Sequence, residues 1–140
     1  FVLYLVAFYW FIKEHTLNLA PIRTKKWVTV FSIMHMIHFG FLADSVGLND
    51  LPIVPIKLIG GFLAYSEVIC SAFLIGKIRK TAYHLLSFYY VGFVMGMTFL
   101  ARIRGEFVGA DPEGFHFIGL GIVLVSYGMA EIRLSQIKSI

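Results

Sequence analysis

The sequence predicts an all-α fold, a polytopic bundle of transmembrane helices, from three observations. Hydrophobic residues make up 59% of the 140 residues, charged residues make up only 14%, and the apolar residues gather in long segments separated by short charged connections. Soluble domains usually carry about 25% charged and about 45–50% apolar residues. A water-soluble globule of this length cannot bury so much apolar surface, so we expect lipid to solvate it.

Four segments have the composition of membrane-crossing helices, for which about 20 predominantly apolar residues are needed. They run over residues 27–46, 57–76, 81–101 and 115–130. The sequence therefore predicts four full spans that form a transmembrane bundle over residues 27–133, followed by an inner-side tail at 134–140.

A fifth apolar segment, residues 1–12, is too short to cross a bilayer. It ends in the aromatic run 9–11 and is followed by Lys13, the order of residues found where a helix leaves the membrane. We expect a partial, truncated N-terminal transmembrane helix whose start precedes Phe1, followed by a basic inner-side loop at 13–26. A short interfacial helix and a signal-peptide remnant are the alternatives.

Basic residues gather on one predicted face of the membrane. The loop 13–26, the turn 77–80 and the C-terminal end from Arg133 onward lie on one side if the helices alternate, and they hold nine of the 12 Lys and Arg residues. The opposite side holds five of the eight acids: Asp44, Asp50, Glu106, Asp111 and Glu113. The turn 77–80 and the C-terminus should therefore lie on the cytoplasmic or matrix side of a bacterial or organelle inner membrane.

This topology also explains the net charge of +4. We therefore expect the bilayer and other membrane subunits, not nucleic acid, as partners.

Small residues predict where the helices pack closely. Gly92 and Gly96 form a G-x-x-x-G pair in the fourth segment, and Gly60 and Gly61 offer a small face in the third. Such faces let helix backbones approach each other in membranes. The alternative is that glycine is simply frequent in membrane helices.

Glu67 is the most informative polar residue, because it lies about halfway along segment 57–76. A charge at the bilayer centre costs about 3 kcal/mol on insertion scales. The side chain must therefore be protonated, paired or in contact with water. It is either a neutral glutamic acid bonded to a neighbouring helix, or part of a proton relay or the polar wall of a ligand pocket.

His35 and His38 are the expected partners of Glu67. They lie three residues apart, on one face of the segment 27–46, at nearly the depth of Glu67 if the helices rise about 1.5 Å per residue. Tyr65 and Asp44 complete the candidate set for ligand binding or proton relay. The alternative for each histidine is a packing residue with a satisfied ring.

No catalytic residue and no metal site is predicted. Cys70 falls inside an apolar run and is expected to be a packed, inert thiol. His35-x-x-His38 lacks further zinc ligands, and Glu113-x-x-His116 is a single motif where di-iron bundles use two.

No cofactor is predicted either. Haem b needs two histidines at one level on different helices, whereas His84 and His116 lie near opposite edges. Aromatic runs at 88–90 and 115–117 are typical of packing, and a quinone or sterol groove is the alternative.

The order of features resembles the DoxX-like family of small four-helix membrane proteins over residues 27–133. A glycine-rich helix with Glu67 runs from Leu58 to Gly76 and is followed by the basic turn 77–80. The resemblance implies an accessory subunit associated with redox or quinone chemistry, or an assembly factor, and it transfers only Glu67 and the glycines. Asp44 departs from the lysine that the family often has, and the segment 1–12 is not part of the four-helix unit.

A second resemblance is to the sterol-isomerase fold, in which intramembrane acids surround an apolar ligand. It implies a pocket formed by Asp44, Glu67 and His38. The predicted function is an accessory or assembly subunit of a larger membrane complex, respiratory or photosynthetic, without its own catalytic site. The alternative is a small membrane enzyme or binding protein for a quinone or sterol.

Overall fold

A computed structural model describes residues 1–48, 55–78, 80–106 and 112–138 of the chain. Within these ranges the fold is all-helical, as predicted, and the only extended feature is an isolated bridge between Ile75 and Ile78. The five helices are α1 (Val2–Thr16), α2 (Ile22–Leu48), α3 (Pro55–Leu74), α4 (Thr81–Ile103) and α5 (Gly114–Lys138).

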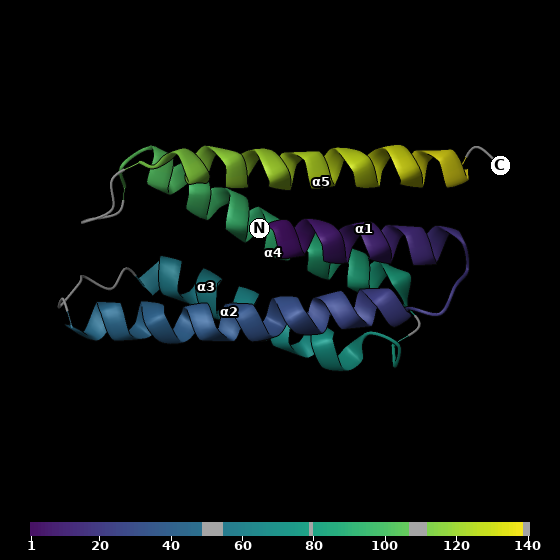
Figure 1. The fold of residues 1–140 in the computed structure, drawn as a ribbon, viewed down its shortest axis with the longest axis horizontal. Helices are drawn as coiled ribbons and strands as arrows, with labels where there is room; N and C mark the ends of the chain where they lie inside the picture. The colour runs from purple at the N-terminus through teal and green to yellow at the C-terminus, as the bar shows by residue number, and fades with distance from the viewer. Residues whose placement is uncertain (49–54, 79, 107–111, 139–140) are drawn as a thin grey trace.

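The helices form a ring in which successive helices run antiparallel, and α1 and α5, which close the ring, run parallel (Figure 1). Each helix packs against the next one in the chain, and α5 returns to pack against α1. The interior of the ring is filled where α1 also touches α4. Helices that follow one another in the chain are therefore neighbours in space, which is the usual topology of helix bundles.

A glycine in the left-handed backbone conformation follows two of the helices. Gly76 follows α3 with φ of 87°, and Gly105 follows α4 with φ of 69°. Glycine adopts this conformation without the steric penalty of a Cβ atom, which makes it the common residue just past a helix end. These two glycines let the chain turn back sharply towards the next helix.

The most buried helix is α1. Tyr4, Ala7, Phe8 and Phe11 follow the helical spacing of one face, and all four are buried. The Phe8 ring stacks on Phe88 of α4 with a centroid distance of 4.8 Å. The segment 1–12 is thus inside the bundle, whereas the sequence analysis set it apart from the unit at 27–133. Its aromatic face packs against neighbouring helices, because α1 contacts α2, α4 and α5.

Glu14 anchors the connection between α1 and α2. Its side chain is buried at 5% exposure, and its carboxylate accepts hydrogen bonds from the backbone N–H groups of Arg23 and Thr24 at 2.9 and 3.0 Å. The Thr24 hydroxyl donates a third hydrogen bond at 2.7 Å. The carboxylate therefore caps the first turn of α2, where free N–H groups and the helix dipole favour a negative charge.

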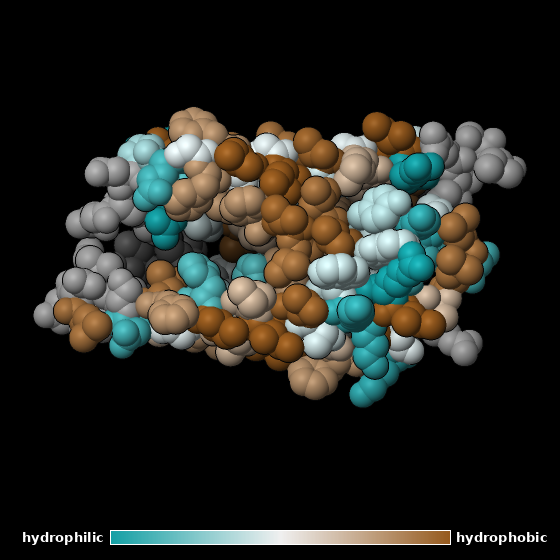
Figure 2. Space-filling model, in the orientation of Figure 1, coloured by the Kyte–Doolittle hydropathy of each residue, from teal (hydrophilic) through white to brown (hydrophobic). Residues whose placement is uncertain are grey.

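Three helices are long and apolar enough to cross a membrane. The candidate stretches are Ile22–Asp44, Thr81–Ile103 and Gly114–Ser135, and most of the side chains in each are not buried inside the bundle. In α3 the described apolar part, Ile59–Leu74, is shorter. Figure 2 shows apolar side chains over the middle of the molecule, as expected for a surface in contact with lipid.

Positive charge gathers at the end of the bundle where α1 meets α2 and α3 meets α4. Hydrophilic side chains collect at this end in Figure 2. We call it the basic end, and among the described residues it holds Lys13, Arg23, Lys25, Lys26, Lys77, Lys80 and Arg133. The other end holds Asp44, Glu106 and Glu113, while Asp50 and Asp111 lie outside the described residues. The predicted charge asymmetry along the bundle axis is therefore present in the fold.

Candidate functional site

Glu67 faces α4 and not α2. The Tyr83 hydroxyl, on the first turn of α4, lies near the Glu67 carboxylate and the Cys70 thiol. In the described part of the chain, no hydrogen bond or ion pair joins Glu67 to His35 or His38. The reason is rotation about the helix axis: Tyr65 takes the side of α3 that faces α2, and two residues further along the helix turns by about 200°.

His35 is a packing residue at the contact between α2 and α3. Its Nδ1 lies 3.0 Å from the Phe31 carbonyl, so that nitrogen carries the proton and donates one helical turn back. The ring lies 3.9 Å from the Phe31 ring and 6.3 Å from the Tyr65 ring. Tyr65 also contacts Phe39 at 4.8 Å. The structure therefore brings two predicted site residues, His35 and Tyr65, together among aromatic rings.

His38 and Asp44 lie on the exposed surface of α2. Within the described residues the His38 ring makes no hydrogen bond, although it is close enough to His35 to influence it electrostatically. The five candidate residues thus point in at least three directions: Glu67 towards α4, His35 and Tyr65 into the contact of α2 with α3, and His38 and Asp44 outward.

Cys70 is exposed, which corrects the prediction of a packed thiol. It lies on the outer face of α3, one turn from Phe73 and two turns from Leu63, both of which are also exposed. An apolar run in a membrane helix contains lipid-facing and core-facing positions alike. Composition alone therefore could not tell which side of the helix the thiol occupies.

Gly92 is the tightest helix contact. A Cβ atom at this position would lie 2.7 Å from the Tyr127 hydroxyl oxygen and closer still to that of Tyr4, which real Cβ atoms do not tolerate. A Cβ atom on Gly96 would lie 3.7 Å from a Val123 methyl carbon, which is an ordinary contact distance. Gly60 and Gly61 would meet nothing within 4 Å, so their small faces are open in this structure.

Two tyrosines use the space beside Gly92. The Tyr4 hydroxyl donates a hydrogen bond to the Phe88 carbonyl at 2.8 Å, and the Tyr127 hydroxyl donates to the Tyr89 carbonyl at 2.6 Å. These carbonyls lie about one helical turn before Gly92, where the missing side chain uncovers the α4 backbone. We call this contact of α1, α4 and α5 the tyrosine junction, and its members are Tyr4, Phe88, Tyr89, Gly92 and Tyr127.

The sequence analysis missed the tyrosine junction and a second close contact. A Cβ atom on Gly119 of α5 would lie 2.6 Å from the Phe99 ring of α4. A usable signal was present in each case, because a buried tyrosine hydroxyl needs an acceptor and a bulky ring needs a small opposite residue. What the sequence lacked was the identity of the opposite helix.

Serine hydroxyls cross the interior between α2, α3 and α4. The Ser71 and Ser87 hydroxyl oxygens lie 2.7 Å apart, and the Ser32 hydroxyl donates to the Val68 carbonyl at 2.7 Å. Ser71 and Ser87 line a central cavity of about 20 Å³, together with residues that include Tyr4 and Phe88. That volume matches a single water molecule. A quinone or sterol site is usually about 300–1,000 Å³, so this cavity does not hold such a ligand.

The histidines near the two ends of the bundle are engaged locally. His84 is buried and its Nε2 lies 2.9 Å from the Ile78 carbonyl, while its Nδ1 has no partner among the described residues. His116 is buried and its Nδ1 accepts a hydrogen bond from the Glu113 N–H at 3.0 Å, which caps the start of α5. No group of three or more His, Cys, Asp or Glu side chains in the described ranges could hold a metal ion.

Comparisons with known proteins leave the resemblance to the DoxX-like family as a prediction. No protein-family model, no curated protein and no solved structure matches the chain.

Proposed function

We propose that the chain is an integral membrane accessory or assembly subunit of a larger membrane complex, and that it binds its partner through the outer half of α2. In this proposal α2 to α5 all cross the membrane, and the basic end faces the cytoplasm or matrix. The observation that carries the proposal is the exposure of residues 36–44 of α2, every one of which is exposed.

Few described side chains cover the outer half of α2. With about 1.5 Å of rise per residue, the 27 residues of α2 are about 40 Å long. The inner half of α2 packs against α1 and α3, and Val28, Phe31 and Ser32 are buried there. Beyond it, Phe39 of α2 contacts Tyr65 of α3 with a ring-centroid distance of 4.8 Å.

The position of His38 favours contact of this surface with a partner protein and not only with lipid. It lies 12 residues after Lys26, or about 18 Å along the helix, which is close to the middle of a hydrocarbon core about 30 Å thick. Hydrocarbon offers its ring nitrogens no hydrogen bond, and an unsatisfied polar group there is costly. Intramembrane histidines are for this reason usually turned towards another helix or a water-filled cavity.

Two apolar residues flank His38 on the same face. Met34 and Phe41 lie one turn before and one turn after it, and both are exposed. Together they form a seam of apolar, polar and apolar side chains. This seam fits a transmembrane helix that offers one hydrogen-bonding side chain at mid-depth.

The alternative of a quinone or sterol pocket has less support. It required Glu67, His35 and His38 to line one pocket, but Glu67 is turned to Tyr83 and His35 to Phe31. The redox or respiratory character of the partner complex rests on the DoxX-like resemblance alone.

Site-specific photo-crosslinking tests this function. A benzophenone amino acid in place of Phe41 should give one discrete adduct with a partner chain in the native membrane, and His38→Leu should abolish that adduct. The matched control is the same amino acid in place of Phe93, an exposed residue of α4, which should label lipid only. Migration of the gently extracted chain as a lone small species, together with equal labelling from both positions, would overturn the proposal.

A further inference from the structure

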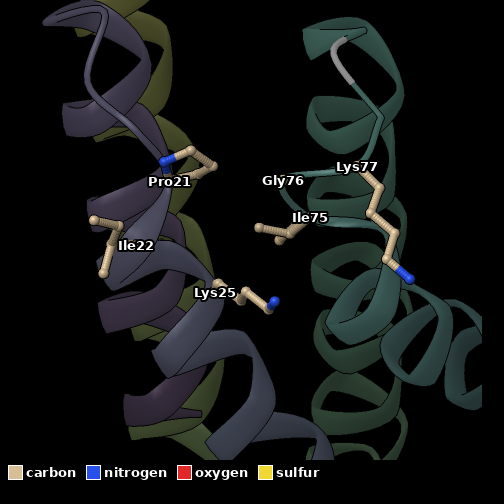
Figure 3. Close-up of a pocket in the computed structure, with 6 residues that line it drawn as sticks. All are labelled: Pro21, Ile22, Lys25, Ile75, Gly76 and Lys77. Carbon is tan, nitrogen blue, oxygen red and sulfur yellow. The ribbon is translucent and has the colours of Figure 1, made fainter.

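A groove opens at the basic end between the start of α2 and the turn that follows α3. It has a volume of about 230 Å³ and is lined by Pro21, Ile22, Lys25, Ile75, Gly76 and Lys77 (Figure 3). Two of the six lining residues are cationic, three are apolar, and none is acidic. This combination is typical of a site for an anion that carries an apolar tail.

Backbone geometry sets the width of the groove. Gly76, with φ of 87°, ends α3 opposite the residue that precedes α2, and a Cβ atom on it would lie 3.8 Å from Pro21 Cγ. Ile75 is buried and closes the inner part of the groove. In Figure 3 Lys25 extends from α2 into the groove, and the Lys77 side chain runs along the opposite wall. The groove is therefore lined by one lysine on each wall.

No carboxylate of the described chain neutralises these two lysines. Neither takes part in an ion pair among the described residues. Glu14, the acid nearest to Lys25 in the sequence, is buried and accepts hydrogen bonds from the amides of Arg23 and Thr24. It caps α2 from within the protein, so the positive charge available to a ligand here comes from the lysines and not from the helix end.

The groove lies at the level of the membrane–water interface. Arg23 lies 4.2 Å and Lys13 lies 4.9 Å from the Trp10 ring. Tryptophan with neighbouring cations marks the headgroup level of a bilayer. Lys25 follows Arg23 by two residues, so it lies within a few ångströms of that level along the helix.

We propose that this groove binds the phosphate of an anionic phospholipid, with the Lys25 and Lys77 ammonium groups on the phosphate oxygens. Ile22 and Ile75 contact the glycerol region and the first part of the acyl chains, which continue along the outer surface of α2 and α3 into the membrane. This lipid site is independent of the partner seam on α2, which lies on the outer half of that helix.

Native mass spectrometry of the full chain tests the site. The chain is reconstituted with phosphatidylglycerol as a minority lipid in phosphatidylcholine, extracted gently and examined for retained lipid. The wild type should keep one phosphatidylglycerol in preference to phosphatidylcholine. Each lysine near an anionic surface contributes to the binding free energy of an anionic lipid. Removal of both charges, by Lys25→Gln with Lys77→Gln, should therefore weaken retention of phosphatidylglycerol by about 30-fold.

A charge-matched double variant separates the groove from the general charge of the basic end. Lys26→Gln with Lys80→Gln removes the same two charges from exposed residues that do not line the groove, and it should keep the bound lipid. Equal loss from both double variants, or no selective retention by the wild type, would overturn the proposal. Displacement of the lipid by millimolar inorganic phosphate would also overturn it, because free phosphate would then be the ligand. Helical content and thermal unfolding of each variant show whether it is folded.

Discussion

The Tyr4 hydroxyl donates a hydrogen bond to the Phe88 carbonyl, 2.8 Å away, and so joins residues 84 positions apart in the sequence. The Tyr4 side chain is fully buried, and its ring lies against Phe8 and Phe31 as well as Phe88. This contact joins α1 to α4 across the interior of the ring. The stability of the bundle should therefore depend on the tyrosine junction more than on any feature of the outer surface.

Gly92→Ala should destabilise the protein, because the new methyl group would collide with the Tyr4 and Tyr127 hydroxyls. Overpacking of this kind typically costs about 1–3 kcal/mol. Thermal unfolding in mild detergent measures the loss. Gly61→Ala is the matched control, since a methyl group there meets nothing within 4 Å, and equal midpoints for the two variants would contradict the predicted clash.

Tyr4→Phe should lower the free energy of unfolding by about 0.5–1.5 kcal/mol, the usual net value of one hydrogen bond. The ring and its aromatic contacts stay, so only the hydroxyl is tested. In the double variant Tyr4→Phe with Gly92→Ala, the loss of unfolding free energy should be smaller than the sum of the losses in the two single variants. The reason is that the absent Tyr4 hydroxyl leaves room for the new methyl group. Strict additivity in this double-mutant cycle would show that the two residues do not share one space.

Glu14→Ala should destabilise the start of α2, because three hydrogen bonds to the carboxylate are lost at once. The loss of a helix cap typically costs about 0.5–2 kcal/mol. Hydrogen exchange should accelerate at the amides of Arg23 and Thr24 while the centre of α4 keeps its protection. Glu106→Ala is the control, since Glu106 forms only an exposed ion pair with Arg104, and such pairs contribute about 0–1 kcal/mol.

A nitroxide spin label on Cys70, the only cysteine of the chain, should report a lipid environment. The thiol is exposed on the outer face of α3, so dissolved oxygen should relax the label efficiently and a charged nickel chelate should not. A label on Lys80→Cys in a Cys70→Ser background should show the reverse, because Lys80 is exposed at the basic end. High accessibility of Cys70 to the nickel chelate would place this face of α3 in water and contradict membrane insertion of that helix.

The sequence by itself determined the helical character and the approximate position of each element. The segments predicted at 27–46, 81–101 and 115–130 lie inside α2, α4 and α5. Charged residues at the segment ends indicated which ends share one side. These properties are local, because they depend on the length of apolar runs and on the solvent that each run requires.

Only the tertiary structure decided which side chains meet. Equal depth suggested that Glu67 meets His35 or His38, but helix rotation turns Glu67 to Tyr83 and leaves His38 on the surface. Depth follows from counting residues along a helix, whereas the direction of a side chain depends on how each helix is rotated against its neighbours. The same reason explains the exposed thiol of Cys70 and the place of α1 inside the bundle. A transmembrane sequence is apolar on all its faces, so its pattern does not reveal which face is buried.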